Sequence, residues 1–74
     1  MSFGIEYLIE TTQEDSVCHT FMAKASTLDA AQAEALTNAA DAKIKGATGY
    51  QIRHLNAVDR VVSIENFSGS AVQR

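Results

Sequence analysis

Large apolar residues recur at every second position near the start of the chain. Residues 3–11 alternate in this way, with two glutamates among the intervening positions. A period of two predicts a β-strand with one buried face. A polar, turn-prone segment at residues 12–16 follows, and apolar residues return at residues 17–23. We therefore expect a second strand that forms a hairpin with the first.

A single long helix is expected over residues 28–45. The segment is rich in alanine and holds neither glycine nor proline, and its apolar residues recur at helical spacing. Ser26 and Thr27 both suit the start of the helix, Ser26 and Asp29 have the spacing of a capping box, and Gly46 suits the C-terminal cap. Short alanine side chains predict a close approach of one helix stripe to the sheet. This stripe consists of Leu28, Ala31, Ala35, Leu36, Ala39, Ala40 and Ile44.

Two further strands are expected after the helix. Residues 50–55 alternate again, residues 56–59 supply turn residues, and residues 60–67 have the composition of a last strand. The expected fold class is therefore α+β, in the order β-β-α-β-β, with a four-stranded, mainly antiparallel sheet and one helix packed on one face. We expect a single domain over residues 1–67 and a flexible C-terminal tail over residues 68–74, whose composition is typical of linkers.

The two faces of this sheet are expected to differ. Alternation assigns six apolar residues to the helix-facing side, namely Ile5, Tyr7, Phe21, Ile52, Val62 and Ile64. The outer face then receives Leu8, Met22, Leu55, Val61 and Phe67, among Glu6, Glu10, Lys24, Arg53 and Glu65. A mixed apolar and charged surface is typical of a protein interface. The alternative is that several of these residues lie beneath loops or at sheet edges.

Composition places the chain among ordinary globular domains, because 46% of its 74 residues are hydrophobic and 20% are charged. A core of this size leaves little stability to spare, and the single cysteine, Cys18, has no partner for an internal disulfide. Small domains of this kind gain stability from regular packing or from oligomerisation. We expect neither a signal peptide nor a membrane span, and a free thiol fits a reducing, cytoplasmic location.

The net charge of −3 is unevenly distributed. Residues 1–42 carry a net charge of −6 and residues 43–74 carry +3. An acidic chain is not expected to bind nucleic acid over its whole surface, although the cations of the second half are numerous enough for a local basic patch. A solvated surface that carries both signs is the simpler interpretation. The residues of such a basic patch would be Lys43, Lys45, Arg53 and Arg60.

No set of residues has the spacing of a catalytic or metal site. Cys18 and His19 are adjacent in a predicted strand, so their side chains point to opposite faces and cannot act together as nucleophile and base. Together with His54 they lack the spacing of a zinc site. The glycines of residues 46–49 follow a helix rather than precede one, which favours a connector over a phosphate loop. We therefore expect no enzyme, no cofactor and no metal.

The order of the elements resembles that of some small anti-CRISPR proteins of phages. The shared features are a hairpin, the helix opening S-T-L-D-A-A-Q-A at residues 26–33, a glycine-bounded connector and a final hairpin, over residues 3–67. Those proteins are often acidic and non-enzymatic, and they bind Cas surveillance complexes and block their DNA-binding surfaces. The resemblance implies an inhibitor with a nucleoprotein partner, and no functional residue is transferred by it.

Three hypotheses for function remain open at this point. The first is such an inhibitor, whose acidic first hairpin competes with phosphates for a basic DNA channel. The second is a homodimeric structural or accessory protein-interaction module that pairs through its sheet face or a free strand edge. The third is a small nucleic-acid-binding protein. The expected partner-binding residues are Glu6, Leu8, Glu10, Glu14, Asp15, Met22, Arg53 and Leu55.

Overall fold

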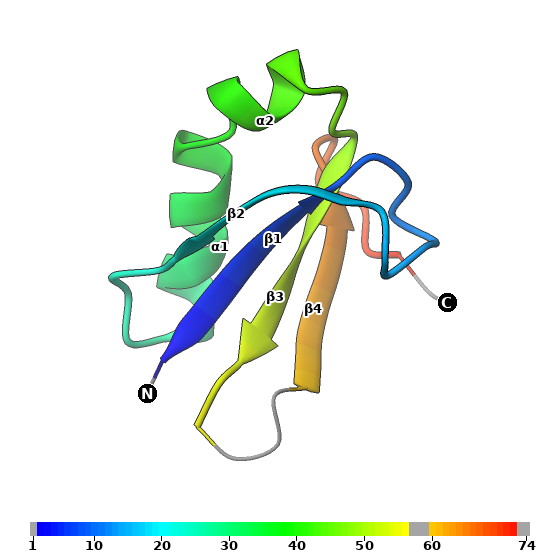
Figure 1. Cartoon of the computed structure of the whole chain (residues 1–74). Helices are drawn as coiled ribbons and strands as arrows, with labels where there is room; N and C mark the ends of the chain where they lie inside the picture. Colours follow the sequence, from blue (N-terminus) through cyan, green and yellow to red (C-terminus); the bar gives the residue numbers. More distant parts are fainter. Residues whose placement is uncertain (1, 57–59, 73–74) are drawn as a thin grey trace.

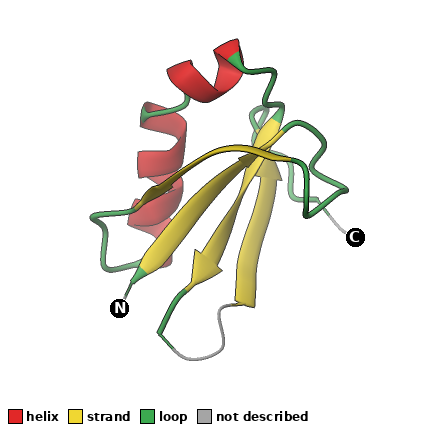
Figure 2. Ribbon diagram, in the orientation of Figure 1, coloured by secondary structure: helices red, strands yellow, loops and turns green. Residues whose placement is uncertain are grey.

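The computed structural model describes residues 2–56 and 60–72, and it confirms the α+β class with four strands in one sheet (Figure 1). The sheet order is β2-β1-β3-β4, and each neighbouring pair is antiparallel. Helix α1 packs against β1 and β3, and α2 lies against β2 (Figure 2). The elements are β1 (Phe3–Leu8), β2 (Val17–Met22), α1 (Leu28–Thr37), α2 (Ala40–Ile44), β3 (Gly49–His54) and β4 (Arg60–Asn66).

The prediction of one continuous helix over residues 28–45 is wrong, because the segment divides into α1 and α2 at Asn38 and Ala39. The Asn38 side-chain amide donates to the carbonyl oxygen of Glu34, and the Thr37 hydroxyl donates to that of Ala33, both at 2.9 Å. Polar side chains that bond back to the last carbonyls of a helix compete with its continuation. Two helices therefore replace the single one that the periodicity predicted.

The predicted start of the helix at Leu28 and the glycine at its end are confirmed, but the predicted Ser26–Asp29 capping box is wrong. Thr27, rather than Ser26, caps α1, and its hydroxyl oxygen accepts a hydrogen bond from the backbone N–H of Ala30 at 3.3 Å. Gly46 follows α2 with a φ of 96°, the left-handed conformation that favours glycine at a helix end. These two residues thus mark where the helical segment begins and where it ends.

The core lies between the helices and the sheet, and it pairs small helix residues with large strand residues. Ala31 and Ala35 of α1 are fully buried, as are the rings of Tyr7 and Tyr50. The alanines allow the helix backbone to approach the rings, so that the Tyr7 hydroxyl reaches the carbonyl oxygen of Ala35. The buried cluster consists of Phe3, Ile5, Tyr7, Ala31, Ala35, Ala39, Ala42, Ala47, Tyr50 and Ile52.

The predicted faces are wrong for three residues of the last strand and the turn after it. Ile64 lies opposite Gln51 and therefore on the outer face. The Glu65 carboxylate accepts a hydrogen bond from the Tyr50 hydroxyl, and the Phe67 ring contacts that of Tyr50, so both lie on the helix side. The cause is a bulge at Val62, which is left without a partner on β3 and shifts the alternation by one residue.

The segment after β4 returns along the edge of that strand. Gly69 adopts a φ of 91°, and Ala71 forms an isolated bridge with Glu65. The flexibility predicted for residues 68–74 stays a prediction, and residues 73–74 lie outside the described residues, as does most of the turn predicted at residues 56–59. Neither helix in the described part of the chain has the length and apolar character that crossing a membrane requires.

Candidate functional site

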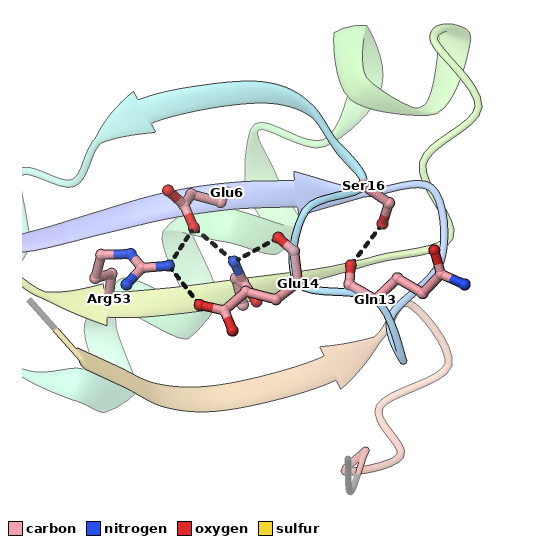
Figure 3. Close-up of polar contacts among 6 residues, drawn as sticks. Glu6, Gln13, Glu14, Ser16 and Arg53 are labelled. Carbon is pink, nitrogen blue, oxygen red and sulfur yellow. Dashed lines mark hydrogen bonds and ion pairs between the residues drawn. The ribbon is translucent and has the colours of Figure 1, made fainter.

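Four polar side chains meet on the outer face of the sheet (Figure 3). The Arg53 guanidinium nitrogen Nη2 lies 3.3 Å from Glu6 Oε1 and 3.1 Å from Glu14 Oε1. Gln51 Nε2 donates to the same Glu6 oxygen at 2.6 Å. Burial lowers the pKa of Arg53, but the hydrogen bonds with Glu14 and Glu6 outweigh that effect and raise the pKa above its usual value. The cluster therefore keeps Arg53 charged and paired.

The loop between β1 and β2 brings Glu14 to this cluster. The Ser16 hydroxyl oxygen lies 2.8 Å from the carbonyl oxygens of both Glu10 and Gln13, to either of which its one proton can be donated, and it accepts from the Glu10 N–H. These bonds fold the loop so that Glu14 reaches over the sheet toward Arg53 (Figure 3). The centre of the outer face is consequently covered by the protein itself, and Gln51 is fully buried.

The structure separates the residues that were predicted to bind a partner. It brings together Glu6, Glu14 and Arg53, because both glutamates pair with Arg53. Leu8 is fully buried and is therefore unavailable to a partner, whereas Met22 is 61% exposed on β2. The remaining three are Glu10 and Asp15, which are exposed in the loop, and Leu55, which is partly buried against the backbone of Gly4.

These positions bear directly on the acidic-hairpin hypothesis. Two of its four carboxylates, Glu6 and Glu14, are already paired with Arg53. To bind the cations of a partner, these two carboxylates would have to release Arg53. Glu10 and Asp15 extend into solvent. The hypothesis stays a prediction, and these two carboxylates are the ones on which it now depends.

One edge of the sheet is covered by the chain's own C-terminal segment. Along β4, the N–H of Asn66 donates to the carbonyl oxygen of Ser70 at 3.1 Å. The N–H of Val72 donates to the carbonyl oxygen of Ile64 at 3.0 Å. These two bonds occupy outward-facing backbone groups of the strand. Covering an edge in this way is one of the means by which proteins prevent unwanted strand pairing.

The opposite edge, formed by β2, is not covered in this way by any described residue. The N–H of Ala23 donates to the carbonyl oxygen of Phe3, and bonded and non-bonded pairs alternate along antiparallel strands. The backbone groups of Phe21 therefore face β1, and those of Thr20 and Met22 face outward. Within residues 2–56 and 60–72, no segment pairs with this outward side. A row of backbone donors and acceptors is thus presented to solvent.

A groove of about 540 Å³ runs beside this edge on the helix side. Its strand wall holds the Phe21 ring, and its helix wall comes from the end of α1 and the start of α2. The Glu34 carboxylate closes one side by accepting hydrogen bonds from the N–H groups of Lys24 and Ala25. The groove is lined by His19, Phe21, Met22, Lys24, Glu34, Asn38 and Asp41.

The sequence analysis placed Met22 and Lys24 on a candidate interface and considered a free strand edge, but it did not identify the other groove residues. Thr20 gave no signal, because its role depends on the position of β2 at the sheet edge. Asn38 and Asp41 line the groove only because the helix divides beside them. The division itself had a possible signal, since Thr37 and Asn38 are two successive residues that can bond back to helix carbonyls.

The described part of the chain offers no grouping of three or more histidine, cysteine, aspartate or glutamate side chains suited to a metal ion. Cys18 is a free, partly buried thiol packed against the core, and His19 Nδ1 lies 3.1 Å from Lys45 Nζ. The open β2 edge and the groove beside it form the candidate binding site. No family model, curated protein or solved structure matches this chain.

Proposed function

We propose that this chain is a protein-binding module that adds an extended segment of its partner to the open edge of β2. In strand addition, main-chain hydrogen bonds supply affinity, and pockets for alternate side chains supply specificity. The observation that carries the proposal is the contrast between the two edges. The β4 edge is covered by residues 70–72, and the β2 edge presents the backbone groups of Thr20 and Met22 beside a groove.

The groove supports the proposal because it lies beside β2, where it can receive side chains of a strand bound at that edge. Side chains of an added strand alternate between the two faces of the sheet, so every second one would project toward the helix side of β2. There it meets the Phe21 ring, which is only partly buried, with the Asp41 carboxylate on the far wall. An apolar or basic side chain fits such a position, since the ring offers apolar contact and the carboxylate accepts hydrogen bonds.

The outer sheet face offers a weaker surface. Its centre is occupied by the pairing of Arg53 with Glu6 and Glu14, and the loop that carries Glu14 lies over it. A partner that bound there would have to displace these contacts. At the β2 edge, the outward backbone groups of Thr20 and Met22 have no backbone partner among residues 2–56 and 60–72 that a bound strand would have to displace.

A proline substitution at Thr20 tests the proposal, because proline removes the backbone N–H and is tolerated at sheet edges. The Thr20 N–H faces away from β1, so Thr20→Pro removes no hydrogen bond of the isolated sheet. The matched control is Thr20→Val, which changes the side chain and keeps the N–H. Met22→Pro removes a second backbone N–H that faces away from β1 and serves as an independent variant. Thermal unfolding shows which of these proteins are folded.

The binding probe is a set of peptides selected from a displayed random library on sparsely immobilised wild-type protein. We expect selected peptides that bind wild type and Thr20→Val alike and that bind the folded proline variant at least about tenfold more weakly, the loss of one well-formed hydrogen bond. Selection of no peptides, or only of peptides that bind the proline variant equally well, would contradict strand addition at β2.

A further inference from the structure

We infer that the segment which occupies the β2 edge is β2 of a second copy of this chain, paired antiparallel about a two-fold axis. The inference rests on the proposed function and names its partner. Pairing of this kind is isologous, so the same strand serves both copies and the assembly closes as a dimer. The two four-stranded sheets would then form one continuous sheet in which neither β2 edge is open.

The charges at the two ends of β2 carry the inference. The loop that precedes the strand is acidic and exposes Glu10 and Asp15, whereas Lys24 is exposed just beyond its other end. The β2 strand carries a bulge at Cys18, where Leu8 pairs with Val17 and Tyr7 with His19. In an antiparallel pair centred on Thr20, each Lys24 therefore lies beyond the bulge of the second copy, next to the acidic loop that precedes its β2. Opposite charges therefore meet at both ends of the interface. A parallel arrangement would place like charges together at each end.

The side chains of β2 are also compatible with pairing to themselves. In the same register Thr20 faces its own copy, and threonine pairs are favourable across antiparallel strands. The helix-side neighbours are His19 and Phe21, so the Phe21 ring of each copy lies opposite His19 of the other. Met22, which is 61% exposed in the isolated chain, gains cover near the start of the second β2. Apolar surface that is exposed beside an open strand is thereby removed from water.

The size of the domain agrees with this assembly. A chain of 74 residues has a small core, and its single cysteine provides no internal disulfide. Domains of this size commonly depend on disulfides, metals, oligomerisation or very regular packing. A long unpaired strand edge is in addition an aggregation hazard that proteins cover or close. Dimerisation through β2 would add stability to the small domain and would also cover its unpaired strand edge.

Charge reversal at the two ends of β2 gives the sharpest test. We would measure the dimer dissociation constant by sedimentation equilibrium for wild type, Lys24→Glu, Asp15→Lys and the double variant. Each single variant brings like charges together and should weaken the dimer at least about threefold, more so at low salt. The double variant restores an opposite pair and should recover most of the loss. The control is Arg60→Glu, which reverses an exposed cation at the start of β4, on the opposite edge, and should leave the constant unchanged.

The outcomes separate this inference from the proposed function. A dimer that is lost in Thr20→Pro, kept in Thr20→Val and rescued by the double charge reversal supports the inference. A chain that stays monomeric up to a concentration of about 1 mM overturns it, because a dissociation constant above that value means negligible self-association. The proposed function then stands if peptides sensitive to Thr20→Pro are selected, and falls with the inference if they are not. A dimer dissociation constant that is unchanged in Thr20→Pro, or unchanged in both single charge-reversal variants, also overturns the inference.

Discussion

The phenolic hydroxyl of Tyr7 donates a hydrogen bond to the backbone carbonyl oxygen of Ala35, 2.5 Å away. This bond joins the C-terminal part of β1 directly to the backbone of α1. It is possible because Ala35 has almost no side chain, so the helix axis approaches the ring closely. Both residues are fully buried, and the contact fixes the distance between the helix and the sheet.

Ala35→Leu should therefore destabilise the protein. The larger side chain has no free space at this buried position, and overpacking of this kind costs roughly 1–3 kcal/mol. For a domain of this size, each kcal/mol lowers the melting temperature by about 4–8 °C. Ala39→Leu should behave in the same way, because Ala39 is 2% exposed. Thermal unfolding followed by circular dichroism measures the effect.

The matched control is Ala33→Leu, the same chemical change at an exposed position of α1. It should alter the melting temperature little, since exposed substitutions usually change stability by less than about 0.5 kcal/mol. Equal melting temperatures for Ala35→Leu and Ala33→Leu would show that the close approach of α1 to the sheet is not present in solution.

The two tyrosines of the chain predict a loss of stability at high pH. Burial, followed by the nearby Glu34 carboxylate, raises the pKa of Tyr7 from 10.0 to about 12. Burial, followed by the hydrogen bond to Glu65, raises the pKa of Tyr50 as well. Each group ionises more readily in the unfolded chain, so its contribution is fully present below pH 10 and is lost as the pH rises through the folded pKa.

Denaturant unfolding at a series of pH values measures this dependence. The free energy of unfolding should fall between pH 10 and pH 12, and it should fall less steeply in Tyr7→Phe, where only Tyr50 still titrates. Tyrosinate absorbance reports on these two groups alone, because the chain has two tyrosines and no tryptophan. Native protein that ionises both tyrosines near pH 10 would contradict their burial.

Two strand glycines should respond oppositely to alanine. A Cβ on Gly49 would meet the Glu65 carbonyl oxygen and the Thr11 methyl group and would lie 2.8 Å from the Asn66 Cα. Backbone cannot move aside easily, so we expect Gly49→Ala to cost about 3 kcal/mol, at the upper end of overpacking effects. A Cβ on Gly4 would lie 3.5 Å from a flexible methyl group of Leu55, which is ordinary contact.

Gly4→Ala should therefore be neutral or stabilising, by up to about 1 kcal/mol, because alanine reduces the entropy of the unfolded chain. Urea unfolding of the two variants beside wild type provides the comparison. If Gly49→Ala were no less stable than Gly4→Ala, β4 would not pass as close to the start of β3 as the structure places it.

Local signals in the sequence were sufficient for most of the secondary structure. The start of α1 at Leu28 and the left-handed Gly46 follow from capping chemistry within a few residues. The side assigned to Ile64 was wrong because a bulge at Val62 leaves no mark on the apolar pattern. A one-residue shift of this kind moves every later side chain to the other face.

The candidate site was largely beyond the reach of the sequence, because it depends on contacts between distant segments. Glu14 was expected to bind a partner, whereas the structure pairs its carboxylate with Arg53, a contact that depends on the fold of the loop. The open edge depends on the strand order, in which β1 pairs with both β2 and β3 and leaves β2 outside. Likewise, the cover on β4 comes from a segment whose composition predicted a flexible tail.

Amide hydrogen exchange at Thr20 and Met22, resolved by NMR in dilute and in concentrated protein, tests the role of the β2 edge most directly. Exchange reports which amides are hydrogen-bonded and how often those bonds open. We predict rapid exchange of both amides in dilute protein and protection as the concentration rises, with Asn66, whose N–H is bonded to Ser70, protected under both conditions. Thr20 and Met22 amides that are as protected as that of Phe21 in dilute protein, or that gain no protection on concentration, would contradict an open edge that a second copy closes.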